Sequence, residues 1–265
     1  QLGLQIALYD RTAVSSALRD DPSAATRLIG LRSPLCHLAF SRYIHQRPDL
    51  ADDMIAIAEM LVENGASVDE SMSLSTENDH QLSVLYGAIG HGDNMVLGRW
   101  LLEKGANPND NESLYHATEL GHHEGLRMLL EHGANPRGTN ALLRAMDFDD
   151  ITAVRMLLDA GALADEFDGT HVGGERPWVI PALHQAARRM SSPEMIRLLL
   201  DAGADPARQF EGCSCYGYAR VFGNQALARE IEKRGAAPQL TSEETLLAMA
   251  ADGADTQGRV IDAER

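Results

Sequence analysis

A short phrase recurs along this chain and constrains its fold more than any other feature. The phrase is an apolar segment, a polar or charged residue, one variable residue, and then Gly-Ala followed by a turn. Its glycines stand at 65, 105, 133, 161, 203 and 235, so successive copies are 40, 28, 28, 42 and 32 residues apart. Self-similarity of this kind indicates one supersecondary unit of about 33 residues that is repeated along the chain.

Each unit has the pattern of two helices. The residues before each Gly-Ala carry apolar side chains at helical spacing, as in Leu126, Leu129 and Leu130, which predicts an outer helix. Glycine follows where a helix end needs left-handed backbone, so the outer helix ends there. A shorter inner helix is predicted upstream of each outer helix, where alanine lets neighbouring units pack closely. These alanines are Ala39, Ala88, Ala117, Ala145, Ala186, Ala187 and Ala219.

One inner helix has a clear beginning. Ser33 supplies an N-cap hydroxyl, and Pro34 occupies the first turn, where its missing N–H costs nothing. No single pair of helices can bury its own apolar stripe, so the units must stack on one another. The predicted fold class is therefore all-α, a solenoid of stacked helix-turn-helix units.

The same residues resemble the ankyrin repeat family. Its signature runs Thr-Pro-Leu-His-x-Ala-Ala, then Gly-His, an apolar helix and Leu-Leu-x-x-Gly-Ala. The best local matches are Ser33–Ala39, Gly121–Glu124 with Leu129–Ala134, and Ala182–Ala187. Three units depart from the Thr-Pro start, with Glu112-Ser113, Asn140-Ala141 and Ser214-Cys215 in its place. These departures weaken single helix caps and leave the resemblance intact.

The resemblance covers nearly the whole chain and implies a single ankyrin-repeat domain over residues 1–265. Within it we expect an N-terminal partial or capping repeat at 1–30 and a C-terminal capping helical pair at 239–265. Full repeats are expected at 31–70, 71–110, 111–137, 138–165, 166–206 and 207–238. The chain begins without Met, and both a fragment of a longer protein and a single-domain protein fit this start. A signal peptide removed from the chain also stays open.

The charge and cysteine content exclude some classes of ligand. The net charge is −16 and the pI is near 4.9, so the surface repels phosphate backbones and anionic lipids. We therefore expect neither a nucleic-acid nor a membrane ligand, and no apolar run is long enough to span a bilayer. Three cysteines, Cys36, Cys213 and Cys215, form no disulfide framework, which favours a reducing compartment and a cytoplasmic location.

Two stretches between predicted helices, Val68–Gln81 and Leu163–Ile180, are long enough to be loops that carry binding. The short 28-residue spacings leave room only for a bare turn at Asn135–Thr139. Members of the ankyrin family typically bind partners on a concave face, made by the loops and the ends of the inner helices. Carried onto this chain, that implies partner-binding residues at His91, Glu119, Leu120, Phe148, Arg188, Arg189 and Phe222, joined by Arg176 and Trp178 of the second long loop.

Each aromatic candidate also has a structural explanation. Exposed aromatic rings and arginines dominate the energetics of many interfaces, which favours binding roles for Phe148 and Phe222. The alternative is that these rings fold back onto a neighbouring unit as part of the core. Likewise, Trp178 either anchors a partner or pins its long loop onto the stack.

Other reactive side chains point to structure rather than chemistry. Cys213 and Cys215 lack the spacing of zinc ligands and stand where an inner helix opens. The family resemblance implies that His122, at the Gly-His turn, bridges backbone loops between units. Asp147 and its neighbours Asp149-Asp150 are expected to be helix caps and solvated surface. Because no nucleophile elbow, phosphate loop or metal-binding helix motif is present, we expect no catalytic residue, no cofactor and no metal site.

The leading hypothesis is a non-catalytic protein–protein interaction module, a scaffold, adaptor or inhibitor that is monomeric. The net charge favours a partner with a basic patch. Two alternatives stay open. The chain could be the regulatory or substrate-recruiting domain of a larger enzyme, or an acidic mimic of nucleic acid, which would need its acids ranked along one face.

Overall fold

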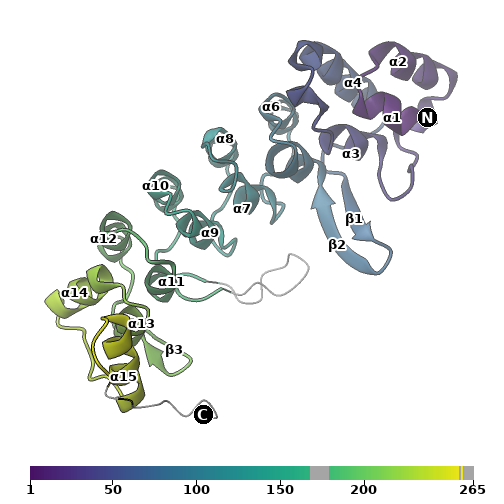
Figure 1. Ribbon diagram of the computed structural model, residues 1–265. Helices are drawn as coiled ribbons and strands as arrows, with labels where there is room; N and C mark the ends of the chain where they lie inside the picture. Colours follow the sequence, from purple (N-terminus) through teal and green to yellow (C-terminus); the bar gives the residue numbers. More distant parts are fainter. Residues whose placement is uncertain (168–178, 257, 259–265) are drawn as a thin grey trace. The chain divides into compact units, whose positions relative to one another are not determined.

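A computed structural model describes residues 1–167, 179–256 and 258 of the chain. The described residues divide into two compact units, an N-terminal unit of residues 1–135 and a C-terminal unit from Pro136 onward (Figure 1). Both units are built from pairs of short helices, and strands among the described residues are limited to two small hairpins. The prediction of an all-α solenoid of stacked helix-turn-helix units is confirmed.

In the N-terminal unit the helices form an inner and an outer layer (Figure 1). The inner layer contains α1 (Leu2–Ala7), α3 (Pro34–Ala39), α5 (Val84–Tyr86) with its π-helical continuation η4 (Gly87–His91), and α7 (Ser113–Ala117). The outer layer contains α2 (Arg11–Asp20), α4 (Ala51–Glu63), α6 (Met95–Glu103) and α8 (Glu124–Glu131). Short 3-10 turns lie in the connections: η1 (Pro22–Ala25), η2 (Tyr43–His45) and η3 (Pro48–Leu50).

The C-terminal unit repeats the two-layer arrangement (Figure 1). Its inner helices are α9 (Ala141–Asp147), α11 (Ala182–Arg189) and α13 (Cys215–Val221). Its outer helices are α10 (Ile151–Asp159), α12 (Pro193–Asp201) and α14 (Gln225–Lys233). Of the helical pair expected at 239–265, one helix is seen, α15 (Ser242–Ala251), which packs on α13. Residues 257 and 259–265 lie outside the described residues.

The core lies between the two layers, where the predicted apolar stripes meet. Leu126 and Leu129 of α8 and Val154 and Leu157 of α10 are fully buried. The alanines that mark the inner helices are buried as well, which allows adjacent inner helices to approach closely. Burial of these stripes stabilises the stack by about 25 cal/mol for each Å² of apolar surface removed from water.

The helix ends follow the predicted cap chemistry. All six glycines of the Gly-Ala phrase have positive φ, and Gly161, with φ of 98°, donates its N–H to the Leu158 carbonyl at 2.9 Å. At the start of α3, Ser33 Oγ accepts the Cys36 N–H at 3.2 Å, and Pro34 follows as the first helical residue. The start of α13 is built in the same way, because Ser214 Oγ accepts the Gly217 N–H at 2.9 Å.

The prediction of a loop over Val68–Gln81 is wrong in part, because these residues form most of an antiparallel hairpin. The strands are β1 (Ser71–Ser75) and β2 (Asn78–Ser83), and Met72 pairs with Leu82, both of them buried. Serine alternates with Met72 and Leu74 in β1, and this period of two is the pattern of a half-buried strand.

Two further connections are short. A second hairpin joins β3 (Gln209–Phe210) to β4 (Cys213–Ser214) through the turn residues Glu211 and Gly212, which both have positive φ. At Asn135–Thr139 the chain makes turns without a strand, as predicted. In the part of the chain that the structure describes, no helix combines the length and the apolar content needed to cross a membrane.

Candidate functional site

The residues that end the inner helices of the C-terminal unit form the most distinctive surface of the chain. The C-cap residues of α9, α11 and α13 are Phe148, Met190 and Phe222, and each side chain is large, apolar and exposed, at 53%, 56% and 45%. Each also stands two residues before the N-cap of the following outer helix. We call these three residues the exposed row. Because the three inner helices pack side by side, the row belongs to one side of the unit.

Sequence reasoning placed Phe148 and Phe222 in this row and missed Met190. The candidate binding residues were located by counting from the alanine of each inner helix to the residues just before the turn. The inner helix α11 contains two consecutive alanines, Ala186 and Ala187, and the count from Ala186 gives Arg188 and Arg189. In the structure α11 continues through Arg189, and Met190 takes the C-cap position. Met190 stands two residues before Ser192, the N-cap of α12, and this spacing would have identified it from the sequence.

The backbone of Met190 is unusual. Its φ is 55° and its ψ is 39°, which is the left-handed conformation that glycine adopts most readily. Holding a residue with a Cβ there costs roughly 1–2 kcal/mol. The chain therefore keeps a bulky apolar side chain in water at a position where glycine would fit the backbone better.

The inner helices of the N-terminal unit end differently. Phe40 and Thr118, the C-caps of α3 and α7, are buried, and Gly92 ends η4, whereas Leu8, the C-cap of α1, is exposed at 43%. Of the residues predicted to bind in this unit, His91 is exposed with its ring 5.3 Å from that of Phe40, while Glu119 and Leu120 are half-buried. Among described residues, three consecutive inner helices that each end in a large exposed apolar side chain therefore occur in the C-terminal unit alone.

Arginines flank the row and gather around one carboxylate. The Arg144 guanidinium lies over the Phe148 ring, 5.1 Å from its centroid, and donates from Nη1 to Asp147 Oδ2 at 3.0 Å. Arg189 donates from Nε to Asp147 Oδ1 at 2.7 Å, and Gln185 donates its amide to the same oxygen at 3.0 Å. Asp147 is therefore the centre of an ion-pair network between α9 and α11, and its expected role as a cap or solvated surface acid is wrong.

Asp149 and Asp150, which follow Asp147 in the chain, lie closer to their predicted role as helix caps and surface acids. Asp150 caps α10 by accepting the Ala153 N–H at 2.9 Å, which confirms a capping role. Asp149 accepts the Ser192 N–H at 3.0 Å, at the start of α12. The difference from Asp147 has a geometric reason, because Asp147 is still on the inner helix and faces α11, whereas Asp149 and Asp150 have passed into the turn.

Arg188 and the aromatic neighbours complete this surface. Burial, followed by the nearby charge of Arg189, lowers the pKa of Arg188 from its ordinary value. The Phe222 ring lies 5.6 Å from that of Tyr218, which in turn lies 4.8 Å from the His184 ring. The remaining predicted binding residues, Arg176 and Trp178, lie outside the described residues.

A cluster in the N-terminal unit explains several histidines. The imidazole of His116 contacts Glu112 Oε2 at 3.1 Å and Glu119 Oε2 at 2.9 Å, and His80 Nε2 lies 3.0 Å from Glu112 Oε1. Burial lowers the pKa of His116, but hydrogen bonds to the two glutamates overcome burial and raise it to about 9. The cluster ties the hairpin strand β2 to α7. Within the described residues no group of three or more His, Cys, Asp or Glu is arranged to hold a metal ion.

His122 corrects a detail of the family-based expectation. Its Nε2 contacts the carboxylate of Asp93 at 2.8 Å rather than a backbone group, and its Nδ1 accepts the Glu124 N–H at 3.3 Å. Asp93 lies in the turn of the preceding repeat, so the histidine still links two repeats through a side-chain acceptor.

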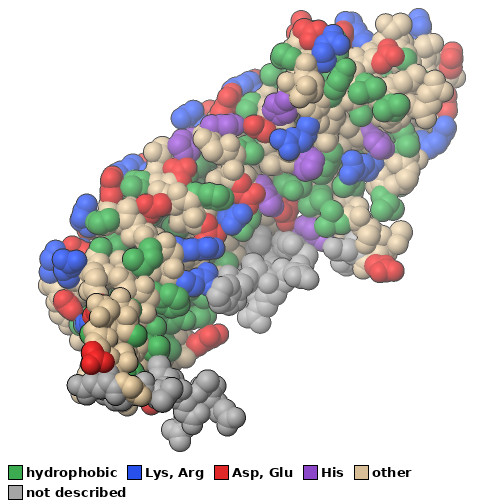
Figure 2. Space-filling model, in the orientation of Figure 1, with side chains coloured by type: hydrophobic (Ala, Val, Ile, Leu, Met, Phe, Trp, Pro, Cys, Tyr) green, Lys and Arg blue, Asp and Glu red, His purple; other side chains and the backbone are tan. Residues whose placement is uncertain are grey.

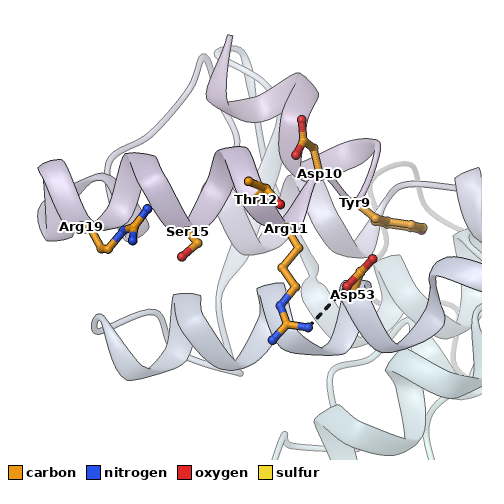
Figure 3. A pocket seen from close by; sticks show the side chains of 7 residues that line it. All are labelled: Tyr9, Asp10, Arg11, Thr12, Ser15, Arg19 and Asp53. Atoms are coloured by element: carbon orange, nitrogen blue, oxygen red, sulfur yellow. Dashed lines mark hydrogen bonds and ion pairs between the residues drawn. The ribbon is translucent and has the colours of Figure 1, made fainter.

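A polar hollow of about 500 Å³ lies between α2 and α4 (Figure 3). Its lining includes Arg11 and Asp53, which form an ion pair at 3.5 Å, and Arg19 further along α2. The charges are of both signs and come from surface side chains. The hollow has no arrangement of a nucleophile and a base that would support catalysis.

The wider surface carries mixed charge. Figure 2 shows acidic and basic side chains interspersed over the visible face, without a continuous field of one sign. A long row of acids, as expected of a nucleic-acid mimic, is not seen on that face.

Comparison with known proteins identifies the repeat. A family model described as ankyrin repeats in three copies matches residues 50–140 and 85–168, and a model of the single ankyrin repeat matches 181–209. Together these matches cover more than half of the chain. Among curated protein sequences, none matches this chain.

Three solved structures share the fold. The ankyrin repeat domain of human ASB11 is 23% identical, with a TM-score of 0.58, over 96% of this chain and 99% of that chain. An ankyrin repeat domain from Acinetobacter baumannii is 24% identical, with a TM-score of 0.55, over 77% and 98%. The ankyrin repeat domain of Bcl-3, a member of the IkappaB family, is 19% identical, with a TM-score of 0.60, over 87% and 97%.

Proposed function

This chain belongs to the ankyrin repeat family, and we propose that it is a non-catalytic module that binds a protein partner through the exposed row. Ankyrin repeats generally mediate protein–protein interaction. The single observation that supports this site is the equivalent position of Phe148, Met190 and Phe222 at the ends of three consecutive inner helices, each with an exposed side chain. Three repeats present the same kind of apolar group on one side.

Folding alone gives no reason for this arrangement. The side chains are exposed, so they contribute little to the core, and their exposed apolar surface forgoes the stabilisation of about 25 cal/mol per Å² that burial would supply. Met190 adds the cost of a left-handed backbone. Exposed large apolar side chains that recur on one side of a protein favour an interaction site. Rings and arginines, as in Phe148 beneath Arg144, are the residue types that most often dominate binding energy.

The proposal also covers the charge of the partner, the cellular compartment and the oligomeric state of the chain. The net charge of −16 supports a partner with a basic patch that meets the acidic remainder of the chain and speeds encounter at low salt. Three unpaired cysteines, two of them buried, support a reducing compartment, and we place the module in the cytoplasm as a monomer. Binding of a preformed repeat surface requires little rearrangement of the chain.

The test is a comparison of captured proteins between matched variants. The intact chain is immobilised, exposed to lysate of its source cells, and the retained proteins are quantified by mass spectrometry. The row variant carries Phe148→Ala, Met190→Ala and Phe222→Ala. Its control carries substitutions of exposed apolar residues outside the row and outside the two long connections, namely Leu4→Ala, Leu28→Ala and Val96→Ala.

We expect a set of proteins that the wild-type chain and the control retain and that the row variant loses. Retention of the same proteins in the same amounts by the row variant would contradict the proposal. Circular dichroism of each variant establishes that the helices are intact before the comparison is made.

A further inference from the structure

We propose that Arg32, Arg42 and His91 bind a phosphate monoester, carried by a phosphorylated side chain of a partner protein. We call these three residues the arginine site. They belong to the N-terminal unit, so the arginine site is separate from the exposed row and is tested without it.

The three residues come together around the end of inner helix α3. Arg32 precedes α3, and its guanidinium carbon lies 5.3 Å from the ring centroid of Phe40, the C-cap of that helix. The ring of His91, the last residue of η4, lies 5.3 Å from the same ring. Arg42 is exposed and follows Phe40 by two residues. Phe40 is buried, whereas Arg32 is half-buried and His91 is exposed, so a ligand has access to both polar groups.

Both arginines act on the imidazole of His91. Burial, followed by the positive charges of Arg42 and Arg32, lowers the pKa of His91 from its ordinary value. The two guanidiniums are therefore near enough to the ring to disfavour its charged form. At neutral pH the imidazole is then uncharged and has one N–H to donate.

The two arginines also lack an acidic partner. In the part of the chain that the structure describes, neither guanidinium lies within ion-pair distance of a carboxylate. Other arginines of the same unit do have such a partner, since Arg27 and Arg47 pair with aspartates at 2.7 Å and 2.6 Å. Two like charges thus stand beside one imidazole, an arrangement that an anion would stabilise.

The carboxylates of the surrounding elements have partners of their own. Glu70 accepts a hydrogen bond from the Ser33 hydroxyl and another from a backbone N–H. Glu112 and Glu119 both contact the imidazole of His116, at 3.1 Å and 2.9 Å. The positive groups of the arginine site therefore remain for a ligand from outside the chain.

The charge of the arginine site favours a phosphate monoester over a carboxylate. A phosphorylated side chain carries a charge of roughly −1.5 to −2 at neutral pH, which matches two guanidiniums, whereas a carboxylate carries a single charge. Guanidiniums also bind phosphate oxygens through paired hydrogen bonds. The imidazole N–H supplies a further donor to the same group.

The net charge of −16 favours a single phosphate over a nucleic acid. A nucleic acid brings many phosphates against an acidic chain, and its binding depends on neutralising them. A lone phosphate responds mainly to the groups within about 8 Å, because charges farther away are screened in physiological salt. A phosphorylated protein is therefore the source that fits this chain.

NMR of the full chain with inorganic phosphate as the probe tests the arginine site. Sodium phosphate replaces sodium chloride at constant ionic strength and neutral pH, and the ring signals of His91 are followed. His91→Gln identifies these signals. We expect a shift that saturates, and binding of acetate that is weaker by at least about tenfold. A shift that does not saturate, or an equal affinity for acetate, overturns the proposal.

Charge removal tests the two arginines. The double variant Arg32→Gln, Arg42→Gln should weaken phosphate binding by at least about tenfold. In chloride it should also raise the titration midpoint of His91, because burial then acts alone. The control Arg19→Gln, an exposed position on outer helix α2, should change neither quantity. If the double variant does not fold, Arg42→Gln alone should show both effects in smaller size, and unchanged values contradict the site.

Labelled probes distinguish the sources of the phosphate. Three peptide pools have random uncharged residues around a central phosphoserine, glutamate or serine, and single-stranded oligodeoxythymidine is the fourth probe. Fluorescence anisotropy should show the phosphoserine pool binding about tenfold more tightly than the glutamate pool, with the difference lost in the double variant. A phosphoserine pool that binds no better than serine, or tighter arginine-dependent binding of the oligonucleotide, overturns the proposal. The exposed row is unaffected by either result, because captured proteins and the row variant test it.

Discussion

Arg189 and Asp147 form a 2.7 Å ion pair that joins the end of α11 to the end of α9. The same carboxylate accepts hydrogen bonds from Arg144 and from the Gln185 amide. Gln185 in turn donates to the Leu143 carbonyl at 2.8 Å, so the network connects side chains and backbone of two repeats. Asp147 thus links the two helices that carry Phe148 and Met190 at their ends.

Replacing Asp147 by alanine should destabilise the C-terminal unit. The substitution leaves three donors without their common acceptor, and loss of one member of a partly buried charged network costs roughly 1–3 kcal/mol. Urea unfolding followed by circular dichroism measures the change. Asp201→Ala is the matched control, because Asp201 is exposed and lies 3.5 Å from Arg234, and such a pair contributes no more than about 1 kcal/mol. Equal effects from the two substitutions would contradict the role assigned to Asp147.

Replacing Met190 by glycine should leave the free energy of unfolding unchanged or raise it by up to about 1 kcal/mol, because glycine accepts the left-handed backbone without a Cβ. The same substitution should weaken binding at the exposed row. Thermal unfolding is compared with that of Leu157→Ala in the core, which should cost about 2–5 kcal/mol. A clear loss of stability in Met190→Gly would show that the side chain serves the fold.

His116 should make the stability of the N-terminal unit depend on pH. Its folded-state pKa, raised to about 9 by Glu112 and Glu119 against the effect of burial, lies above the ordinary 6.5. The stabilisation is therefore complete below about pH 6.5 and is lost as the pH rises through about 9. We expect the free energy of unfolding to fall by on the order of 1–3 kcal/mol over this interval.

Two measurements check this prediction. NMR titration of the His116 ring should give a midpoint near pH 9, and urea unfolding across the pH series should show a smaller slope in the variant His116→Gln. A ring that titrates at the ordinary pKa of histidine would show that the two glutamates do not hold it in its charged form.

The three cysteines should react with alkylating agents at different rates. Burial, followed by the charges of Asp165 and Asp205, raises the pKa of the Cys215 thiol to about 12, and burial also raises that of Cys36. Because the thiolate is the reactive form, iodoacetamide at pH near 8 should modify the half-buried Cys213 first. Mass spectrometry follows the sites, and unfolding in urea should make all three react. Native labelling of Cys215 as fast as Cys213 would be the contrary result.

Much of the fold could be predicted from the sequence because its signals are local. The Gly-Ala phrase places a left-handed residue at the end of each outer helix, as at Gly133 and Gly161. Ser33 and Pro34 start α3 through contacts within a single turn. The hairpin at β1 and β2 carried a local signal as well, since serine alternates with Met72 and Leu74, although the long stretch between helices suggested a loop.

The candidate site could be predicted only in part. Phe148 and Phe222 follow from the register of the repeat, but their exposure does not, because a ring at the same place is buried in Phe40. Met190 depends on where α11 ends, and two consecutive alanines leave that end undetermined by one residue.

What the sequence by itself determined is the repeat, its pairs of helices and their caps, because apolar spacing and cap chemistry act over a few residues. The tertiary structure decided which side chains meet from different repeats. Asp147 reaches Arg189 on another inner helix, and His116 shares Glu112 with His80 of the hairpin. Such contacts depend on how neighbouring repeats pack, and the same packing leaves the exposed row in water.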